Sequence, residues 1–527
     1  MTEVARPAAA ETESGFTHDQ DQSHEAAPEG RRRPPFEGAA LRNGLRLRLA
    51  RAGALLDHHE RLLPWVVAGV LFVVLFSLAM GRYHTLMATY DLGYFRQSAW
   101  LIAEGREPFV TVRGLHLLGD HANLAFYPMA WLTAVLPPVP TLLGIQAGAL
   151  AITVVPLYSF ARRVAGLSLP ASAALLLAYA LYPAMTNVNL FDFHPEAIAV
   201  PLLTAATYWS ATRRWLPYAV AVGIVLACRE DMGLVISALG VLCILEGNRR
   251  AGILTIVAGV AWIVIATRFI QPAFAGGEFV QAAVRYPQYG ETMAEVLFGM
   301  LTHPRQVVSD LVTRENLGVV IALFGPVAFL CLAAPRYLLP GLPLQLLYLV
   351  SNVGAAHTIG AQYTVGIIPF VFLATAMVLG RRERKDADMF LPKLILPATL
   401  LFFVQLSSAS VLHAPWRWAT RDDVDKATLA AARLVPRDAP VSTSTGLWPV
   451  IADREDLYYF PMPFERYAPS GDPKPLERRR SEVRYIVVDT VGVNQWGPEF
   501  QVALDRIVAE QGFTRIFDRE GVLVFRR

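Results

Sequence analysis

Long runs of apolar residues, separated by short polar breaks, fill most of the chain between residues 62 and 411. A helix needs about 20 predominantly apolar residues to cross the hydrocarbon core of a bilayer. Two of the runs, 216–229 and 231–246, are shorter and are expected to be kinked or enclosed by other helices. The pattern predicts eleven spanning helices, at residues 62–80, 141–161, 169–187, 195–211, 216–229, 231–246, 251–269, 317–334, 337–352, 361–380 and 391–411. The expected fold is a mainly α-helical, polytopic membrane protein.

Two longer stretches interrupt this pattern, at residues 81–140 and 270–316. In the first, segment 122–136 is apolar but short, so we expect a helix that dips into the membrane without crossing it. Another short helix is expected to start at Asp91 and to stop at Gly105, because glycine commonly follows the end of a helix. Its periodicity places four apolar side chains on one face: Leu92, Phe95, Ala99 and Ile102. This helix is expected to lie along the membrane interface.

The two ends of the chain differ from its middle. Residues 1–55 are rich in Ala, Glu, Pro and Arg and have few large apolar residues, which predicts a disordered tail. Residues 412–527 contain no run long enough to span a membrane, but short stretches typical of strands. The strands are expected at 440–444, 456–460 and 484–489, with a helix at 498–511 and a closing hairpin that turns at 519–521. We therefore expect a tail, a membrane domain at 56–411 and a small α/β domain at 412–527.

Composition and charge support a membrane location and predict an orientation. The 527 residues are 54% hydrophobic and 17% charged, whereas soluble proteins carry about 25% charged residues. Arginine pairs such as Arg162-Arg163 and Arg249-Arg250 stand at the ends of apolar runs, and such basic loops stay in the cytoplasm. This places the N-terminal tail inside, and the C-terminal domain outside, what we expect to be a bacterial plasma membrane. The net charge of +3 gives no reason to expect a nucleic-acid partner.

On this topology a set of ionisable side chains converges on the outer side of the bundle. Such groups are costly at membrane depth, by about 2.5–3.5 kcal/mol each at the centre of a helix. The set consists of Asp91, Asp120, His121, Asp192, His194, Glu196, Glu230, Asp231 and His357. Because the inner ends of the runs carry mostly arginine pairs, the distribution favours a pocket open to one side over a path through the membrane.

Two interpretations of Asp91 remain open at this point. It stands where the N-terminal amides of its helix need an acceptor, so it can be an ordinary helix cap. Alternatively, a carboxylate on an interfacial helix at the mouth of a membrane bundle is placed for chemistry on a lipid headgroup.

The residues around Asp192 also allow two interpretations. In the sequence NLFDFHPEA, Pro195 suits the first turn of the next helix and Glu196 the positive end of its dipole. Alternatively, Asp120, His121, Asp192, His194 and Glu196 together hold a divalent metal ion or form a hydrogen-bond network around a phosphate. Their spacing matches no zinc motif, and the three cysteines lie in apolar runs.

Arg229 and Glu230, in the sequence CREDM, interrupt two apolar runs. An ion pair that closes the turn explains them structurally. A guanidinium that grips a lipid phosphate in two places, oriented by Glu230, explains them functionally. His357 is a second candidate ligand for such a phosphate, although a histidine at an interface is often merely solvated.

Several blocks of the chain resemble a known family. They are DLGYFRQSAWLIAEGR, LGDHANLAFYPMAWL, NLFDFHPEAIAVPLL, CREDMGLV, QYTVGIIPF and VSTSTGLWPVIADREDLYYFP. In this order they look like the bacterial predicted membrane proteins called domain of unknown function 2079, from about residue 66 to about residue 490. That family is similar in turn to the GT-C superfamily of polytopic glycosyltransferases.

The resemblance implies an activity and a site. GT-C enzymes take a sugar from a polyprenyl-phosphate donor on the extracytoplasmic side, and an acidic residue early in the first outer loop commonly acts as catalytic base. By position that residue is Asp91. Many relatives carry paired acidic residues here, whereas Asp91 precedes Leu92 and Gly93, so its partner would be Asp120 or Glu230.

The sequence therefore predicts an inverting glycosyltransferase that passes the sugar to an acceptor of the cell envelope. The alternatives are a transporter or flippase for a lipid or small solute, and a non-catalytic assembly protein. A polar path for transport is hinted at by Tyr158, Thr186, Asn187, Gln345, Ser351 and Asn352.

Overall fold

The computed structural model describes residues 60–88, 90–277, 285–386, 390–465, 467, 469, 471, 472, 474–491 and 498–527. The tail predicted at residues 1–55 lies outside these residues, as does part of the stretch 270–316. The described residues belong to one compact unit, which begins at His59.

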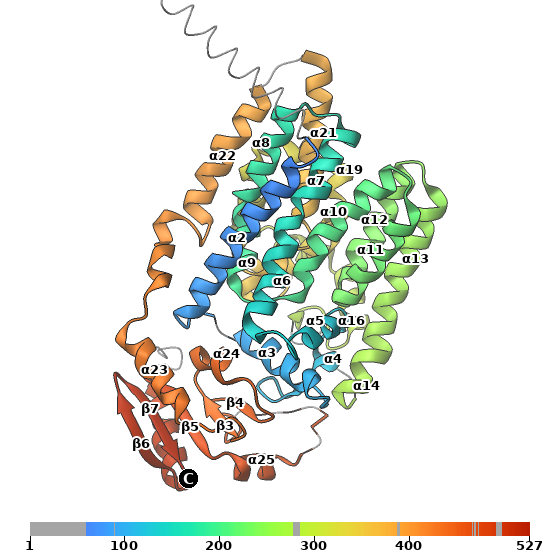
Figure 1. Cartoon of the computed structure of the whole chain (residues 1–527). Coiled ribbons are helices and arrows are strands. Elements are labelled where there is room, and N and C mark those ends of the chain that lie inside the picture. The colour runs from blue at the N-terminus through green and yellow to red at the C-terminus, as the bar shows by residue number, and fades with distance from the viewer. Residues whose placement is uncertain are drawn as a thin grey trace, which may run out of the picture. The chain divides into compact units, whose positions relative to one another are not determined.

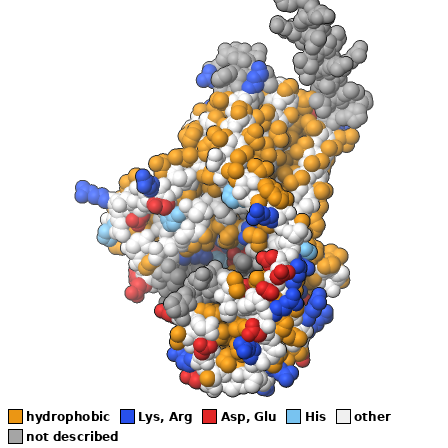
Figure 2. Space-filling view, turned by 90° about the vertical axis from the view of Figure 1, so that its left-hand side faces the viewer, with side chains coloured by type: hydrophobic (Ala, Val, Ile, Leu, Met, Phe, Trp, Pro, Cys, Tyr) orange, Lys and Arg blue, Asp and Glu red, His pale blue; other side chains and the backbone are white. Residues whose placement is uncertain are grey.

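Most of this unit is a bundle of helices (Figure 1). Its helices are α2 (Leu63–His84), α6 (Pro138–Ile152), α7 (Val154–Phe160), α8 (Leu169–Ala180), α9 (Pro183–Phe191), α10 (Ala199–Ala211), α11 (Trp215–Cys228), α12 (Met232–Leu245), α13 (Arg249–Ile265), α18 (Arg314–Phe324), α20 (Leu342–Leu349), α21 (Ile368–Asp386) and α22 (Phe390–Leu406). Figure 2 shows apolar side chains covering the upper part of one face, over the bundle, and charged side chains gathering below them. This division is the one expected of a protein embedded in a bilayer.

Among the residues that the structure describes, five helical stretches are long and apolar enough to cross a membrane. They are Leu63–His84, Pro138–Ala165, Leu169–Phe191, Arg249–Ala275 and Lys393–His413, with α11 and α12 as shorter apolar helices. The short length predicted for the runs 216–229 and 231–246 is confirmed, since α11 and α12 have 14 residues each. The total of eleven spans stays a prediction.

The structure corrects the spans predicted at 317–334 and 337–352. The first holds α18 and the 3-10 turns Gly325–Val327 and Leu330–Ala333; the second holds α19 (Pro335–Leu338) and α20. The reason is proline, which lacks a backbone N–H and clashes with the preceding turn. Pro326, Pro335, Pro340 and Pro343 divide an apolar sequence that would otherwise form two long helices.

The first outer stretch folds into short elements at one end of the bundle, on the side of the C-terminal strands (Figure 1). They are α3 (Tyr90–Ala103), β1 (Phe109–Val110), β2 (Leu115–His116), α4 (Leu117–Asp120) and α5 (Phe126–Leu132). The predicted helix thus exists, starting at Tyr90 rather than Asp91, and its predicted apolar face is buried. Segment 122–136 contains only the seven-residue α5, too short to cross a membrane.

The second outer stretch contains α14 (Gln271–Ala275), α16 (Met293–Thr302) and α17 (Pro304–Leu311). Helix α16 begins with a capping box, in which Thr292 accepts from the Glu295 amide and the Glu295 carboxylate accepts from the Thr292 amide.

The C-terminal part holds a five-stranded sheet in the order β4-β3-β5-β7-β6. The strands are β3 (Val441–Thr443), β4 (Leu457–Tyr459), β5 (Tyr485–Asp489), β6 (Thr514–Arg519) and β7 (Val522–Arg526), and the helices are α23 (Asp423–Arg433), α24 (Trp448–Ile451), α25 (Leu476–Glu482) and α26 (Pro498–Glu510). Strand β3 runs parallel to β4 and β5, while β7 pairs antiparallel with β5 and β6. The predicted strands, the helix at 498–511 and the closing hairpin are confirmed.

The first outer stretch is bound tightly to this sheet. Gln97 of α3 donates to the Glu455 carbonyl at 2.9 Å, and the Thr111 hydroxyl donates to the Leu457 carbonyl at 2.7 Å. At Gly93 the backbone of α3 approaches Trp448 of α24 so closely that an added Cβ would lie 2.6 Å from the Trp448 Cβ. Helix α3 is therefore fixed between the bundle and the C-terminal sheet.

Candidate functional site

Asp91 lies in the first turn of α3 and faces a histidine. Its Oδ2 is 3.5 Å from Nε2 of His194, which follows helix α9. The Leu92 amide of the same turn donates to Oδ2 of Asp192 at 3.4 Å. A neighbouring carboxylate thus accepts from an N-terminal amide of α3, and Asp91, inside the helix, points to His194. This arrangement does not support the helix-cap interpretation of Asp91.

A buried glutamine holds the turn that carries Asp192 and His194. The Gln146 amide, on α6, donates to the Asp192 carbonyl at 2.6 Å and accepts from the His194 amide at 2.7 Å. Pro195 then begins a 3-10 turn at Pro195–Ile198, where its missing N–H costs nothing. Long-range hydrogen bonds and local proline chemistry together orient the His194 side chain.

His194 is almost fully buried, at 3% exposure, and surrounded by carboxylates. Burial by itself would lower its pKa, but the hydrogen bond and charge of Asp91, with the charges of Glu196 and Asp192, raise the pKa overall. Its other ring nitrogen, Nδ1, has no hydrogen-bond partner among the residues that the structure describes. The ring therefore faces Asp91 with Nε2 and leaves Nδ1 for another partner.

Glu196 is bound to Arg229 in a second group, in which both of these side chains are buried. Nη1 of Arg229 donates to Glu196 at 2.8 Å, while Nε donates to Asp231 at 2.9 Å. Nη2 donates to Asp231 and to the Tyr348 hydroxyl, and that hydroxyl donates to Asp231 at 2.6 Å. Arg229 is 3% exposed, so its guanidinium is occupied by protein groups.

Glu230 turns the other way, toward the first outer stretch. Its carboxylate lies 2.8 Å from Nδ1 of His121 and accepts from the Ala122 amide at 3.1 Å. Burial would raise its pKa, but the His121 charge and hydrogen bond outweigh burial and lower the pKa to about 2. Glu230 therefore stays ionised and clamps residues 121 and 122 to the α11–α12 turn.

Arg113, in the turn between β1 and β2, is the last member of the group of ion pairs near Asp91. Its guanidinium lies 3.4 Å from Asp120, and its charge opposes the rise that burial causes in the pKa of Tyr90. Burial would raise the Asp120 pKa, but the charges of His121 and Arg113 hold it below its usual value. With its side chain 41% exposed, Arg113 is the most accessible cation of the ion pairs around Asp91.

The sequence prediction included neither Arg113 nor Tyr348. A signal was present for Arg113, because it is a cation only seven residues before Asp120 in a stretch already chosen for its carboxylates. Tyr348 gave no local signal, since it lies in an apolar helix.

His357 lies apart from these ion pairs. Its Nδ1 is 2.7 Å from the Asn316 side-chain oxygen and its Nε2 is 2.9 Å from the Ser351 carbonyl. It joins the 3-10 turn Gly354–His357 to α18, so both ring nitrogens are occupied.

The structure thus brings most of the predicted residues together as ion pairs, and neighbouring pairs share residues that are close in the sequence. We call this set the charged cluster; it consists of Asp91, Arg113, Asp120, His121, Asp192, His194, Glu196, Arg229, Glu230 and Asp231. The acidic partner expected for Asp91 was Asp120 or Glu230, whereas its contact is His194. Within the described ranges, no three His, Cys, Asp or Glu side chains converge as metal ligands would, so these residues do not fit a metal ion.

Comparison with protein families matches residues 82–524 to a family described as "Predicted membrane protein (DUF2079)". The chain belongs to this family. The resemblance noted from the sequence is therefore confirmed, and the matched residues include the whole charged cluster and most of the C-terminal sheet.

A search of curated proteins found no match for this DUF2079 protein. The solved structures that match include "Crystal Structure of ArnT from Cupriavidus metallidurans in the apo state", at 11% sequence identity. The alignment covers 87% of this chain and 98% of that chain, with a TM-score of 0.47. A TM-score below 0.5 is too low to carry an inference about activity.

Proposed function

We propose that this DUF2079 protein is a membrane glycosyltransferase that moves a sugar from a polyprenyl-phosphate donor to an envelope acceptor. Asp91 acts as its general base. One observation carries the assignment: the Asp91 side chain is 30% exposed, whereas those of Asp120, Glu196, Glu230 and Asp231 are 9%, 3%, 15% and 15% exposed. Its contact with His194 is made through Oδ2, so Oδ1 is left to accept a substrate proton.

The proposed step is a single displacement. The oxygen of an acceptor hydroxyl attacks the anomeric carbon, the bond from that carbon to the phosphate oxygen breaks, and polyprenyl phosphate leaves with the electron pair. The hydroxyl proton moves to Asp91. A positioned general base typically contributes about 10²–10⁴ in rate. His194 beside Asp91 orients the carboxylate through its contact with Oδ2.

The leaving phosphate needs a positive partner. The sequence pointed to Arg229 and His357, and that assignment stays a prediction. We favour Arg113 for the direct contact, because Arg229 already binds Glu196 and Asp231 while Arg113 holds Asp120 at 3.4 Å and is partly exposed. The charge of Arg113 acts on Tyr90, the residue directly before Asp91, which supports placing the proposed base and the phosphate ligand in one neighbourhood.

This proposal includes the orientation predicted from the arginine pairs. The charged cluster and the C-terminal sheet lie on the extracytoplasmic side, and the membrane lipids supply the polyprenyl donor laterally. The tight connection of α3 to the sheet, through Gln97 and Thr111, supports placing both on one side of the membrane.

Release of polyprenyl phosphate tests this function. Purified wild-type protein, Asp91→Asn and the control Glu107→Gln are each incubated with a panel of polyprenyl-monophosphate sugars and envelope fragments. We expect release by the wild type and the control and a loss of at least about a hundredfold in Asp91→Asn. Glu107 is an exposed acid in the same outer stretch, outside the charged cluster. Equal release by wild type and Asp91→Asn overturns the base assignment, and no release by the wild type from any donor overturns the donor class.

A second function, transport of a lipid or small solute, is favoured by one observation inside the bundle. Gln345 on α20 is buried, and neither its amide nitrogen nor its amide oxygen has a partner among the described residues. The Thr364 hydroxyl, in the 3-10 turn Gln362–Thr364 that contacts α20, also lacks one within the described part of the chain. Buried polar atoms of this kind usually have a hydrogen-bond partner in the protein or in ordered water, so a polar solute would find donors and acceptors here. Solute flux in liposomes that Gln345→Leu abolishes and Asp91→Asn leaves intact would establish transport instead of transfer.

A further inference from the structure

A pocket lined by arginines lies where α3 meets the C-terminal part of the chain. Its volume is about 460 Å³, and α3, α23 and α24 contribute to its walls. Five arginines line it against a single carboxylate, that of Asp453: Arg96, Arg421, Arg433, Arg437 and Arg454. The remaining lining is mostly apolar, with Leu429, Ala432, Val435, Val450 and Ile451.

Two of these arginines are held by the protein. Arg96 donates to both oxygens of Asp453, at 2.8 and 2.6 Å. Arg454 is buried and donates to the carbonyls of Ile451 and Ala439, each at 2.6 Å. Burial and then repulsion from Arg96, against attraction by Asp453 and Asp438, lower the pKa of Arg454 to about 10. Asp453 thus neutralises Arg96, whereas Arg454 is held by carbonyl groups and has no ion pair with the described residues.

The other three arginines can still bind a ligand. Arg421 donates through Nε to the His84 carbonyl at 2.7 Å, which leaves its two Nη groups. Arg433 and Arg437 are exposed and form no ion pair with any residue that the structure describes. Like charges gathered around one cavity repel one another, and an oxyanion that accepts from several guanidinium groups removes that repulsion.

We propose that this arginine pocket binds a phosphate-bearing ligand. A guanidinium presents paired donors that match two phosphate oxygens, and the volume is in the range of small-molecule sites, about 300–1,000 Å³. The site is separate from the charged cluster: Arg96 follows Asp91 by five residues on α3, so the two side chains leave the helix about 140° apart. The proposal does not depend on glycosyl transfer. The phosphate can belong to a soluble or glycan-bound ester or to a lipid headgroup.

Thermal unfolding with and without phosphate ligands tests the site, because a ligand that binds the folded state raises the unfolding midpoint. The soluble probe is inorganic pyrophosphate, added to protein in neutral detergent against sodium chloride of equal ionic strength. The lipid probe is phosphatidic acid in nanodiscs, compared with phosphatidylcholine. The test variant is Arg433→Ala/Arg437→Ala, and the matched control is Arg515→Ala/Arg526→Ala, which removes two exposed arginines outside the pocket.

We expect at least one probe to raise the midpoint of the wild type and the control, with at least tenfold weaker binding by the test variant. A response to pyrophosphate alone identifies a soluble or glycan phosphate, and a response to phosphatidic acid alone a headgroup. No response from the wild type, or equal responses of the two double variants, overturns the proposal.

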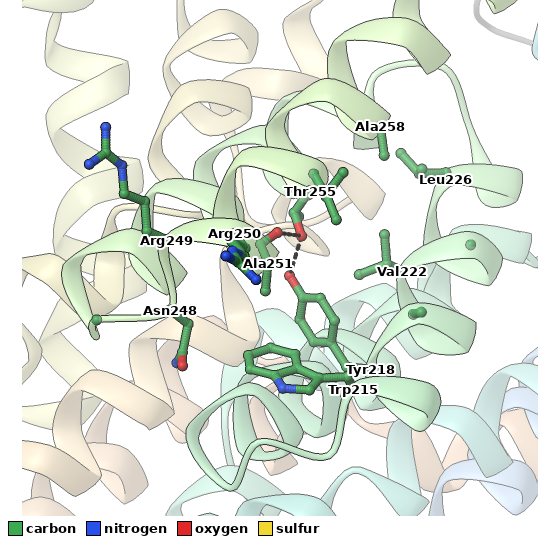
Figure 3. Close-up of a pocket in the computed structure, with 14 residues that line it drawn as sticks. Trp215, Tyr218, Val222, Leu226, Asn248, Arg249, Arg250, Ala251, Thr255 and Ala258 are labelled. Carbon is green, nitrogen blue, oxygen red and sulfur yellow. Dashed lines mark hydrogen bonds between the residues drawn. The ribbon is translucent and has the colours of Figure 1, made fainter.

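A different observation carries a second proposal, a lipid site at the opposite, inner ends of α11 and α13. A cavity of about 780 Å³ lies between these helices. Figure 3 shows Tyr218 of α11 joined to Thr255 of α13 by a hydrogen bond, 2.8 Å long, with Trp215 beside Tyr218. Its apolar lining includes Ala219, Val222, Gly223, Leu226, Leu254 and Ala258.

One end of this cavity is basic. Arg249 and Arg250, the first two residues of α13, line it, are exposed, and have no ion pair with the described part of the chain. The free amides at the start of the 17-residue α13 add positive potential there. Basic pockets between spanning helices on the cytoplasmic side suit anionic lipid headgroups. We infer that the cavity holds an anionic phospholipid, with its chain between α11 and α13 and its headgroup on Arg249 and Arg250.

Native mass spectrometry in neutral detergent, with phosphatidylglycerol added, tests this site. Gly223→Leu fills the cavity, because nothing lies within 4 Å of the Cβ position of Gly223; Gly69→Leu on α2, equally open, is its control. Arg249→Ala/Arg250→Ala removes the headgroup contacts, with Arg381→Ala/Arg382→Ala as its control. We expect at least a fivefold loss of bound phosphatidylglycerol in both test variants and no change in the controls. Retention equal to the controls overturns the inference.

Discussion

Two arginines in different parts of this chain are buried in nearly the same way. Arg229 donates to Glu196, Asp231 and the Tyr348 hydroxyl. Arg479, on α25, donates to Asp456 at 2.5 Å, to Asp472, and to the Tyr458 hydroxyl at 3.1 Å. Each guanidinium thus lies between two carboxylates and a tyrosine, and each side chain is at most 4% exposed.

The surroundings of the two arginines differ. Around Arg479 the neighbouring Lys474 lies 3.2 Å from Asp456 and 2.9 Å from Glu455, and the other oxygen of Glu455 lies 2.9 Å from Arg106. Near Arg229, its partner Glu196 follows His194 by two residues, and His194 faces the partly exposed Asp91. The residue after Arg229 is Glu230, which holds His121. A buried ion network is therefore no sign of function by itself. A partly exposed carboxylate stands next to each network, but Glu455 has a cation on both oxygens, Lys474 and Arg106, whereas the contact of Asp91 with His194 uses Oδ2. This difference in pairing is what distinguishes the bundle.

The largest effect should follow from removing that carboxylate. Asp91→Asn preserves size and the contact with His194 but removes the proton acceptor, so transfer should fall by about 10²–10⁴. The unfolding midpoint should change little, because Asp91 is partly exposed and its contact is long. The measurement is the initial rate of polyprenyl-phosphate release, divided by the fraction of protein that is folded. A variant that loses its fold along with its activity would show that Asp91 is structural, like the acids around Arg479.

The two arginines themselves give the next comparison. Arg229→Met and Arg479→Met each leave two buried carboxylates without their cation, which costs about 3–5 kcal/mol of stability. We expect equal loss of stability in denaturant unfolding. The rate of sugar transfer per folded molecule should be unchanged in Arg479→Met and should fall in Arg229→Met, since Glu196 and Asp231 support the turn next to His194. Unchanged transfer in Arg229→Met would make the two networks equivalent.

The contact between α3, at the end of the helical bundle, and α24, in the C-terminal part, can be loosened at Gly93. Gly93→Ala places a Cβ 2.6 Å from the Trp448 Cβ, so α3 and α24 must separate, at a cost of about 1–3 kcal/mol. Gly69→Ala has open space and should be neutral or slightly stabilising. Thermal unfolding of both variants measures the difference, and a Gly93→Ala protein as stable as Gly69→Ala would contradict the close packing.

The smallest expected effect concerns pH. Burial would lower the pKa of His194, but Asp91, with Glu196 and Asp192, outweighs burial and raises it above the usual 6.5. The stability that the histidinium provides is therefore complete below pH 6.5 and is lost as pH rises through the raised value. The unfolding midpoint of the wild type should fall on this alkaline side, and that of His194→Gln should fall less. If the unfolding midpoints of the wild type and His194→Gln changed with pH in parallel, His194 would be neutral in the folded protein.

The amino-acid sequence by itself determined what depends on local pattern. Runs of apolar residues specified the long helices, because a bilayer selects for length and hydropathy. The periodicity of Leu92, Phe95, Ala99 and Ile102 specified the buried face of α3, and alternation with a glycine turn specified the β6–β7 hairpin. The family, too, was readable from blocks such as DLGYF and NLFDFHPEA.

Only the tertiary structure decided which charged groups meet. Asp91 faces His194 because Gln146 of α6 holds the α9 turn against α3, and nothing near Asp91 in the sequence encodes that contact. Tyr348 reaches Arg229 from an apolar helix, and nothing near either residue in the sequence indicates that contact. Side-chain partners come from distant residues, and their pairing is fixed by packing, so no local pattern could assign the site.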